Sequence, residues 1–341
     1  MDKKNIRELD LNNIVSHYNQ PLFRAKQLYR WLWKKSVNSF DEITDLPDTF
    51  KKELNKEFYI SYITIKKKIV SLDGTIKFLF QLSDGLICEG VLIPQKSRFT
   101  ACISSQVGCS LSCQFCATGT MKRARNILAS EIFDQAFLIM KECERIYGKS
   151  LTNIVYMGMG EPFLNYQNVI NSIKYITNKE GLYFSKKRIT LSTVGIVKMI
   201  KKFAIEDTGV HLAISLHAAC NKKRTKIMGI NQTNNLELLK NALKYYYNKT
   251  KNKVTYEYVM LNEINDSIED VNNLVKFSRI IPSKVNLIEF NIVDGINFKK
   301  SSQERTQKFM EALKKEGVTV NLRKSRGEDV GAACGQLALN N

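Results

Sequence analysis

The sequence predicts an α/β protein whose main part is an open or closed barrel of parallel strands. From about Phe99 onward, short apolar runs rich in β-forming residues alternate with amphipathic runs of helical period. Such repeated strand–helix units predict parallel strands joined by right-handed crossovers. The length of 341 residues allows one large domain of roughly 250 residues and a small one. Polar motifs also follow several of the expected strands, at the barrel end where active sites lie.

The expected barrel elements follow one another without repeats or low-complexity tracts. The strand runs are TACISS, NIVYMGMG, RITLSTVG, HLAISLHA, VTYEYVML, VNLIEFNIV and finally VTVNLR. The amphipathic runs between them cover residues 129–147, 166–176, 196–203, 236–247, 268–280 and 303–316. Short apolar runs fit buried strands, and the longer periodic runs fit helices that cover a sheet.

The first 90 or so residues follow a different pattern. Leu28, Trp31 and Leu32 have helical spacing within PLFRAKQLYRWLWKKSV, and LPDTFKKELNKEF predicts another short helix. We expect the Trp and Leu stripe to be core, and the alternative is a platform on which bases stack. The runs ISYITIKKKIV, TIKFLFQL and LICEGVLIP then predict strands that lead into the barrel. The expected units are an accessory module over 1–94, basic and helical to about 60, a barrel over 95–327, and a C-terminal loop over 328–341.

The formal net charge of +19, with a pI near 9.5, favours a polyanionic partner such as RNA or DNA. A general richness in Lys, Asn and Ile explains part of this charge without any binding role. Clustering of the cations favours binding. The clusters are Lys66-Lys67-Lys68, Lys122-Arg123 with Arg125, Lys186-Lys187-Arg188, Lys222-Lys223-Arg224, and Arg323-Lys324 with Arg326.

The sequence is that expected of a cytoplasmic protein. No stretch approaches the ~18 uninterrupted apolar residues of a membrane span, and the opening MDKKNIRELD is too charged for the core of a signal peptide. Eight cysteines without regular pairing favour a reducing compartment and no permanent disulfide framework.

Cys109, Cys113 and Cys116 in GCSLSCQFC have the spacing C-x3-C-x2-C. A structural zinc site needs four protein ligands, usually as two separated pairs, whereas this loop offers three thiolates. Three thiolates suit a four-iron, four-sulfur cluster that keeps one iron open for a small molecule. The alternative is a zinc site completed by Cys102, seven residues before Cys109.

Further polar groups follow the other expected strands, so that they gather at one rim of the barrel. Gly158 to Pro162 follow the second strand, Ser192 ends the third, Ser215-Leu216-His217 end the fourth, and Asn291 ends the sixth. His217 and Ser192 have ordinary structural alternatives as a satisfied core histidine and a turn residue.

The cysteine spacing resembles the signature of radical SAM enzymes. The stretches ACISSQVGCSLSCQFCATG, YMGMGEP, LSTVGIV, SLHA and RGEDVGAACGQL, in this order, resemble the bacterial RlmN family over nearly the whole chain. The resemblance implies a partial (βα)6 TIM-like radical SAM barrel, one [4Fe-4S] cluster and S-adenosylmethionine (SAM). It also implies methylation of C2 of an adenine in 23S ribosomal RNA and in transfer RNAs. The route uses two SAM molecules and a 5′-deoxyadenosyl radical.

The resemblance also implies roles for individual residues. Cys334 matches the methyl carrier, Cys102 the second thiol that forms a transient disulfide with it, and Glu89 the proton acceptor. Without the resemblance, Cys334 is a small hydrophobe and Glu89 lies on the exposed face of a strand. The expected cluster ligands are Cys109, Cys113 and Cys116. The expected SAM contacts are Gly160, Glu161, Ser192, Ser215, Leu216, His217 and Asn291.

Three alternative functions stay open. A Cfr-like enzyme shares the cluster and both cysteines but methylates C8 of the same adenine. Pro162 favours RlmN, because Cfr-like sequences tend to have alanine at this position. A radical SAM enzyme for a small molecule would need neither Cys102 nor Cys334. A non-enzymatic RNA-binding protein would use a structural zinc. For the RlmN reading, the expected partners are the RNA substrates and a reductant such as flavodoxin or ferredoxin, and the expected state is a monomer.

Overall fold

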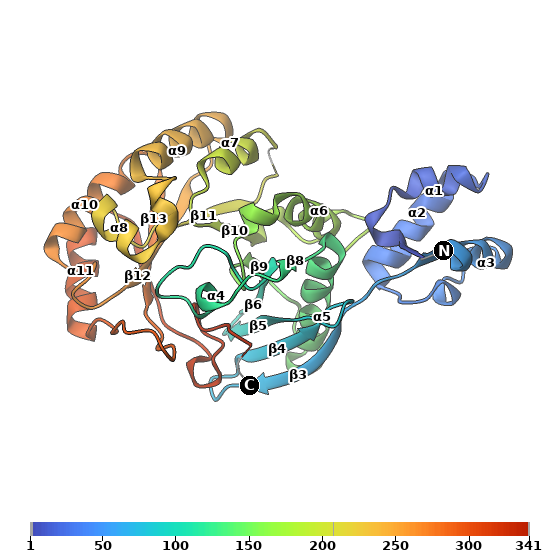
Figure 1. The fold of residues 1–341 in the computed structure, drawn as a ribbon, viewed down its shortest axis with the longest axis horizontal. Coiled ribbons are helices and arrows are strands. Elements are labelled where there is room, and N and C mark those ends of the chain that lie inside the picture. The colour runs from blue at the N-terminus through green and yellow to red at the C-terminus, as the bar shows by residue number, and fades with distance from the viewer. Residues whose placement is uncertain (1–2, 207, 340–341) are drawn as a thin grey trace.

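A ten-stranded sheet forms the centre of the fold, in the order β14-β13-β12-β11-β10-β9-β6-β5-β4-β3 (Figure 1). The computed structural model describes residues 3–206 and 208–339, so residues 340 and 341 of the expected C-terminal loop lie outside it. The strands of the sheet are β3 (Thr64–Val70), β4 (Ile76–Gln81), β5 (Ile87–Gln95), β6 (Arg98–Ile103), β9 (Asn153–Tyr156), β10 (Ile189–Thr193), β11 (His211–Ser215), β12 (Val254–Met260), β13 (Ser283–Glu289) and β14 (Val320–Arg323).

Strand β6 and strands β9 to β14 run parallel, and their order in the sheet follows their order in the chain. A helix follows each of the first six, as the alternation predicts: α5 (Ala129–Tyr147), α6 (Tyr166–Thr177), α7 (Val197–Glu206), α9 (Leu236–Thr250), α10 (Ile268–Ser278) and α11 (Gln303–Lys315). In the described sheet β14 and β3 are the two edges. The barrel is therefore open, and the predicted partial (βα)6 architecture is confirmed, with β14 as a seventh parallel strand.

Burial on both faces explains why the parallel strands read as continuous apolar runs. All seven residues of β12 are buried, and α5 buries Ile132, Phe133, Ala136 and Ile139 among its residues. Each fully buried Leu, Ile, Val or Phe side chain contributes about 1.5–3 kcal/mol relative to exposure. None of the helices that the structure describes combines the length and apolar character needed to span a membrane.

The antiparallel strands β3, β4 and β5 continue the sheet beyond β6. Their register determines which side chains face the barrel. Val91 on β5 lies opposite Cys102 on β6, and Lys77 on β4 lies opposite Val91. Because side chains alternate along a strand, Glu89 shares this face with Val91 and therefore with Cys102.

The N-terminal residues form the predicted helical module, with α1 (Leu11–His17), α2 (Phe23–Arg30), the π-helix η2 (Trp31–Lys35) and α3 (Asp48–Glu57). In Figure 1 these helices lie at one end of the molecule, away from α9 to α11. Leu28, Trp31 and Leu32 are buried, which confirms that this stripe is core. Arg7 binds Asp134 of α5 through two hydrogen bonds of 2.7 and 2.8 Å and so fixes the module to the barrel.

The sequence patterns did not predict several short elements. They are β1 (Lys4–Asn5), β2 (Phe58–Tyr59), β7 (Gln106–Val107), β8 (Arg125–Asn126), α4 (Ala117–Thr120), α8 (Asn221–Ile227), and the 3-10 turns η1 (Ile6–Glu8), η3 (Phe40–Glu42), η4 (Pro162–Asn165), η5 (Lys186–Arg188), η6 (Gly229–Gln232) and η7 (Glu328–Val330). Most contain two to four residues, too few to carry a periodic signal. Two of them, β7 and α4, enclose the cysteine loop.

Candidate active site

Cys109, Cys113 and Cys116 lie in the loop between β7 and α4, each partly buried. The loop packs closely on its own continuation, because a Cβ atom at Gly119 would lie only 2.7 Å from the carbonyl oxygen of Cys113. The backbone N–H of Gln114 donates to the carbonyl of Ile227 at the end of α8. The three thiols are thus held by contacts on both sides of the loop.

A cavity of about 120 Å³, the cysteine-loop cavity, is lined by the three cysteines together with residues from other strand ends. Its lining includes Cys109, Cys113, Cys116, Gly160, Glu161, Ser215 and His217. The structure therefore gathers three of the expected ligands and four of the expected SAM contacts around one space, as their positions at strand ends predict.

The donor set of this loop fits an iron–sulfur cluster. Burial, reinforced by the neighbouring thiols, raises the pKa of Cys113, and burial also raises the pKa of Cys109 and Cys116. Ligand thiols must lose their protons, so binding of a metal group here releases protons. Among the described residues, no group of three or more His, Cys, Asp or Glu side chains is arranged to hold a single metal ion.

Glu161 follows β9 and is almost fully buried. Its carboxylate accepts hydrogen bonds of 2.9 Å from the backbone N–H groups of Phe163 and Val194. Gly160 before it has φ +90°, and a Cβ atom there would lie 2.4 Å from the Gln106 side chain, so only glycine fits this turn. Burial raises the pKa of Glu161 to about 7, although the hydrogen bonds act in the opposite direction.

This raised pKa predicts how the stability of the apoprotein depends on pH. The folded pKa near 7 exceeds the ordinary value of 4.5, so the folded state binds more protons and stability falls as the pH rises from 4.5 to 7. The shift corresponds to about 3 kcal/mol over this window. We expect Glu161→Gln to remove this slope in chemical unfolding of the apoprotein. Glu269→Gln, at an exposed position of α10, is the control, and an unchanged slope in Glu161→Gln would contradict the assignment.

The remaining expected SAM contacts occupy different surroundings. The Ser192 hydroxyl lies 3.3 Å from that of Ser215 on the neighbouring strand. His217 has φ +56°, and its Nδ1 accepts the N–H of Val259 at 3.0 Å, so its second nitrogen carries the proton. Burial lowers the pKa of His217 to about 3, which keeps the ring neutral. Leu216 is fully buried, and its side chain belongs to the apolar core.

Arg224 organises these strand ends, a role that the sequence patterns missed. We expected it to belong to a basic cluster for RNA, but its side chain is fully buried. Its guanidinium donates to the carbonyl oxygens of Val194, Ser215 and Leu216. The assignment of Arg224 to a binding surface is therefore wrong, because burial brings its donors to backbone acceptors at the site.

A second cavity, of about 580 Å³, occupies the barrel lumen. Cys102 and Cys334 both line it, and it shares Cys116, Thr118 and Gly158 with the cysteine-loop cavity. The two cavities are therefore contiguous. Burial raises the pKa of Cys102 to about 12, and proximity to Cys334 acts in the same direction.

Several hydrogen bonds hold the C-terminal segment, residues 327–339, which carries Cys334. Asn291 donates its side-chain amide to the carbonyl of Cys334 at 3.0 Å, and Ala117 donates its N–H to the carbonyl of Gly335 at 2.7 Å. The buried Oδ1 of Asn291 has no hydrogen-bond partner among the described residues, so it is available to a bound molecule. Asn291 thus lies at the lumen cavity and not in the lining of the cysteine-loop cavity.

Glu89 is fully buried, so the interpretation that places it on an exposed strand face is wrong. One carboxylate oxygen lies 3.0 Å from the ammonium nitrogen of Lys77, which is also buried. The C-terminal segment packs beside this pair, because a Cβ atom at Gly331 would lie 3.5 Å from the Lys77 nitrogen, and Asp329 accepts a hydrogen bond from Ser71. These contacts join segments more than 200 residues apart. No local pattern in the sequence reports such contacts.

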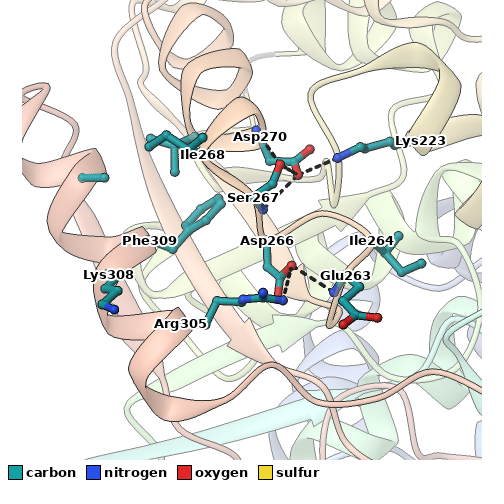
Figure 2. Close-up of a pocket in the computed structure, with 12 residues that line it drawn as sticks. Lys223, Glu263, Ile264, Asp266, Ser267, Ile268, Asp270, Arg305, Lys308 and Phe309 are labelled. Carbon is teal, nitrogen blue, oxygen red and sulfur yellow. Dashed lines mark hydrogen bonds and ion pairs between the residues drawn. The ribbon is translucent and has the colours of Figure 1, made fainter.

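A further pocket, of about 440 Å³, lies on the outside of the barrel and contains none of the expected site residues in its lining (Figure 2). Four of its charged side chains pair with one another: Lys223 with Asp270 at 2.6 Å and Arg305 with Asp266 at 3.4 Å. The expected chemistry therefore belongs to the two cavities within the barrel.

Comparison with known families places both parts of the chain. Residues 103–277 match the radical SAM superfamily, and residues 4–60 match the ribosomal RNA large subunit methyltransferase N-terminal domain. The first match covers the cysteine loop and four of the parallel strands after β6, from β9 to β12. The second covers the helical module.

Individual relatives align over nearly their whole length. The probable dual-specificity RNA methyltransferase RlmN of Cytophaga hutchinsonii is 48% identical over 99% of this chain and 93% of its own. The dual-specificity RNA methyltransferase RlmN of Geotalea uraniireducens is 41% identical over 99% of this chain and 96% of its own. The crystal structure of a radical SAM methyltransferase from Sphaerobacter thermophilus superposes with a TM-score of 0.91 at 36% identity, covering 98% of this chain and 99% of that one.

Proposed function

Because the chain belongs to the RlmN family of dual-specificity RNA methyltransferases within the radical SAM superfamily, we propose that it methylates C2 of an adenine in 23S ribosomal RNA and in transfer RNAs. The observation that carries this proposal is the placement of Cys102 and Cys334 in one lumen cavity that adjoins the cysteine loop. Neither a small-molecule radical SAM enzyme nor a zinc-containing RNA-binding protein needs this pair of thiols.

Cys109, Cys113 and Cys116 would hold a [4Fe-4S] cluster, which supplies the electron for reductive cleavage of SAM when both are bound. The proposed SAM contacts are Gly160, Glu161, Ser192, Ser215, Leu216, His217 and Asn291. The Glu161 carboxylate would accept hydrogen bonds from an ammonium group, and the free Oδ1 of Asn291 offers a further acceptor. Glu161 and His217 are both buried, and polar contacts in such a low-dielectric environment are stronger than in bulk water.

The two cysteines of the lumen cavity would have different roles, Cys334 as the methyl carrier and Cys102 as the thiol that releases the RNA. The Cys334 sulfur receives a methyl group from one SAM molecule, and a second SAM molecule serves to remove a hydrogen atom from that methyl. The resulting carbon radical adds to C2 of the adenine. The adduct loses one electron, for which the oxidised cluster would be the acceptor, and the RNA is then bound through a thioether. After a base removes the C2 proton, the thiolate of Cys102 attacks the Cys334 sulfur, and a disulfide forms as the carbon–sulfur bond breaks. The electron pair of that bond stays on the carbon, which takes up a proton and becomes the methyl group. External thiols reduce the disulfide before the next turnover.

Glu89 is the proposed proton acceptor for the hydrogen at C2. The carboxylate lies on the same face of the sheet as Cys102 and on the strand next to it. Glu89 is fully buried, and Gly331 of the C-terminal segment lies next to its ion-pair partner Lys77, so displacement of this segment is the proposed route by which an adenine reaches the carboxylate. Such a displacement agrees with the exposure of Cys334 itself.

The remaining partners follow from the same proposal. A one-electron reductant such as flavodoxin or ferredoxin supplies the electron, and the chain acts as a monomer in the cytoplasm, where its RNA substrates are. The experiment that tests the function is anaerobic turnover of the reconstituted protein with methyl-labelled SAM and either RNA, followed by nucleoside digestion and mass spectrometry. Label at C2 of adenosine is the expected result. Label at C8 would assign the protein to the Cfr group, and SAM cleavage without labelled RNA would overturn the proposal.

Cations at the lumen cavity provide a binding prediction. Arg98, Lys284 and Lys324 line the cavity, and none of them forms an ion pair among the described residues. Their neighbours Arg323 and Arg326 are instead paired with Glu257 and Asp73. If each of the three free cations meets one phosphate, replacing all three with alanine should lower the slope of log K against log salt by roughly 2 to 3.

The control for this prediction replaces Lys276, Lys314 and Lys315, which are exposed on the outer helices α10 and α11. Both triple variants lose the same formal charge, so a change in slope confined to the lumen variant locates the RNA. Equal slopes in the two variants would show that the lumen cations make no phosphate contact.

A further inference from the structure

Lys77 and Glu89 form a buried ion pair that the proposed reaction leaves unexplained. The Nζ of Lys77 lies 3.0 Å from Oε1 of Glu89, and the two side chains are 4% and 0% exposed. Neither carboxylate oxygen of Glu89 has a hydrogen-bond partner elsewhere among the described residues. Lys77 is therefore the polar group that compensates the buried carboxylate.

Stability alone gives little reason for this pair. Removing two charges from water costs several kcal/mol per ion, and apolar residues of similar volume in place of a buried pair are often neutral or stabilising. The neighbours of the pair on this sheet, Leu79 and Val91, are apolar and buried. An apolar residue at position 77 would therefore suit the packing, if position 89 were not required to carry a carboxylate.

The register of the sheet places the pair beside the proposed chemistry. Lys77 lies opposite Val91, Leu79 lies opposite Glu89, and Val91 lies opposite Cys102, so all these side chains point to the lumen side. The backbone of β5 is also fixed at this point, because the Ser104 hydroxyl donates to the carbonyl oxygen of Glu89. The ammonium group is the contact that fixes the end of the Glu89 side chain.

The segment that carries Cys334 passes close to Lys77. A Cβ atom at Gly331 would lie 3.5 Å from Nζ of Lys77. Two residues of the turn before β4 hold the same segment: Ser71 donates to Asp329 at 2.6 Å, and Asp73 accepts the N–H of Gly327 at 3.1 Å. Lys77 thus lies between the carboxylate and the segment that must move to expose it.

We propose that Lys77 is a positioning residue for Glu89: its ammonium group holds the carboxylate in place, on the lumen face of the sheet, when the C-terminal segment moves away. The proposal rests on the function proposed above for Glu89. Lys77 itself does not contact the adenine. It keeps the acceptor oriented during the step in which a buried carboxylate first becomes accessible to its substrate.

The test follows release of RNA from the thioether adduct, since that step needs the proton acceptor. Lys77→Met removes the charge at nearly constant side-chain length. Lys77→Gln is the second variant, in case Lys77→Met does not fold, because its neutral amide can still donate to a carboxylate. We expect normal cluster content and normal methylation of Cys334, measured by mass spectrometry. Release should be slowed at least about tenfold, a fraction of the effect of a general base. Denaturing electrophoresis would then show accumulated protein–RNA adduct, and Lys77→Arg should release RNA at close to the wild-type rate.

Two companion variants decide among the explanations. Lys223→Met removes a lysine from another buried carboxylate, that of Asp270 on the outside of the barrel (Figure 2), and should destabilise the protein without accumulating adduct. Glu89→Gln should accumulate adduct to at least the extent of Lys77→Met. If Glu89→Gln accumulated adduct but Lys77→Met and Lys77→Gln both released RNA at the wild-type rate, the role of Lys77 would be overturned and that of Glu89 would stand. Wild-type release in Glu89→Gln would overturn the proton acceptor as well.

Discussion

Replacing Cys334 with alanine should abolish RNA methylation, to below about one thousandth of the wild-type rate, because it removes the proposed methyl carrier and leaves, besides the proposed cluster ligand Cys116, only the buried second thiol Cys102 in the lining of the lumen cavity. The protein should still bind its cluster, since Cys334 is not among the residues of the cysteine loop. Mass spectrometry should find no methyl group on the protein after incubation with SAM. The measurement is transfer of labelled methyl to RNA under anaerobic conditions, with the iron content of each preparation determined in parallel.

Cys143→Ala is the matched control for this experiment. Cys143 is a buried thiol on α5, outside both cavities, and burial raises its pKa to about 11. Its replacement removes one buried sulfur and should cost about 1 kcal/mol of stability while leaving methyl transfer intact. Methylated RNA produced by Cys334→Ala at more than a few per cent of the wild-type rate would contradict the carrier role.

Replacing Cys102 with alanine should stop turnover at a later point and leave RNA covalently attached to the enzyme. The carrier remains in this variant, so carbon–carbon bond formation proceeds, but no second thiol is present to form the disulfide. About one equivalent of RNA should remain on the protein through denaturing electrophoresis, and digestion should give a peptide containing Cys334 with an attached adenosine. The wild-type protein should show little of this species.

Cys220→Ser is the control for the second experiment. Cys220 precedes α8, is partly exposed and lines neither barrel cavity. Its replacement should leave both release and product unchanged. If Cys102→Ala released methylated RNA at the wild-type rate, another thiol or a hydrolytic step would have to break the thioether.

The barrel helices could be predicted closely because their signal is local. The amphipathic run at 129–147 is α5 at both ends, and the runs at 236–247 and 303–316 differ from α9 and α11 by at most three residues. A helix that covers a sheet needs an apolar stripe of period 3.6, and this requirement is visible in any window of the sequence. The gathering of Cys109, Glu161 and His217 followed from the topology, because the carboxyl ends of parallel strands share one rim.

The environments of single charged residues could not be predicted in the same way. Glu89 interrupts an apolar run, which locally favours an exposed face, yet it is fully buried and paired with Lys77 of the neighbouring strand. Arg224 belongs to a run of cations, yet it donates to three backbone carbonyls at the strand ends. For both residues the partners lie on other strands or strand ends: Lys77 of β4 for Glu89, and Val194 and Ser215 for Arg224. The pairing of those strands is a property of the fold, which the residue types around each position do not report.

The hydrogen bonds from Asn291 and Ala117 that hold the Cys334 segment also set the competition between thiols. A sulfur held on a short segment beside Cys102 meets that thiol at an effective concentration in the millimolar range or above. The internal thiol therefore reacts before a thiol from solution does. The rate at which RNA is released from the thioether adduct should then be independent of the concentration of added thiol. The rate at which the disulfide between Cys102 and Cys334 is reduced should rise with that concentration.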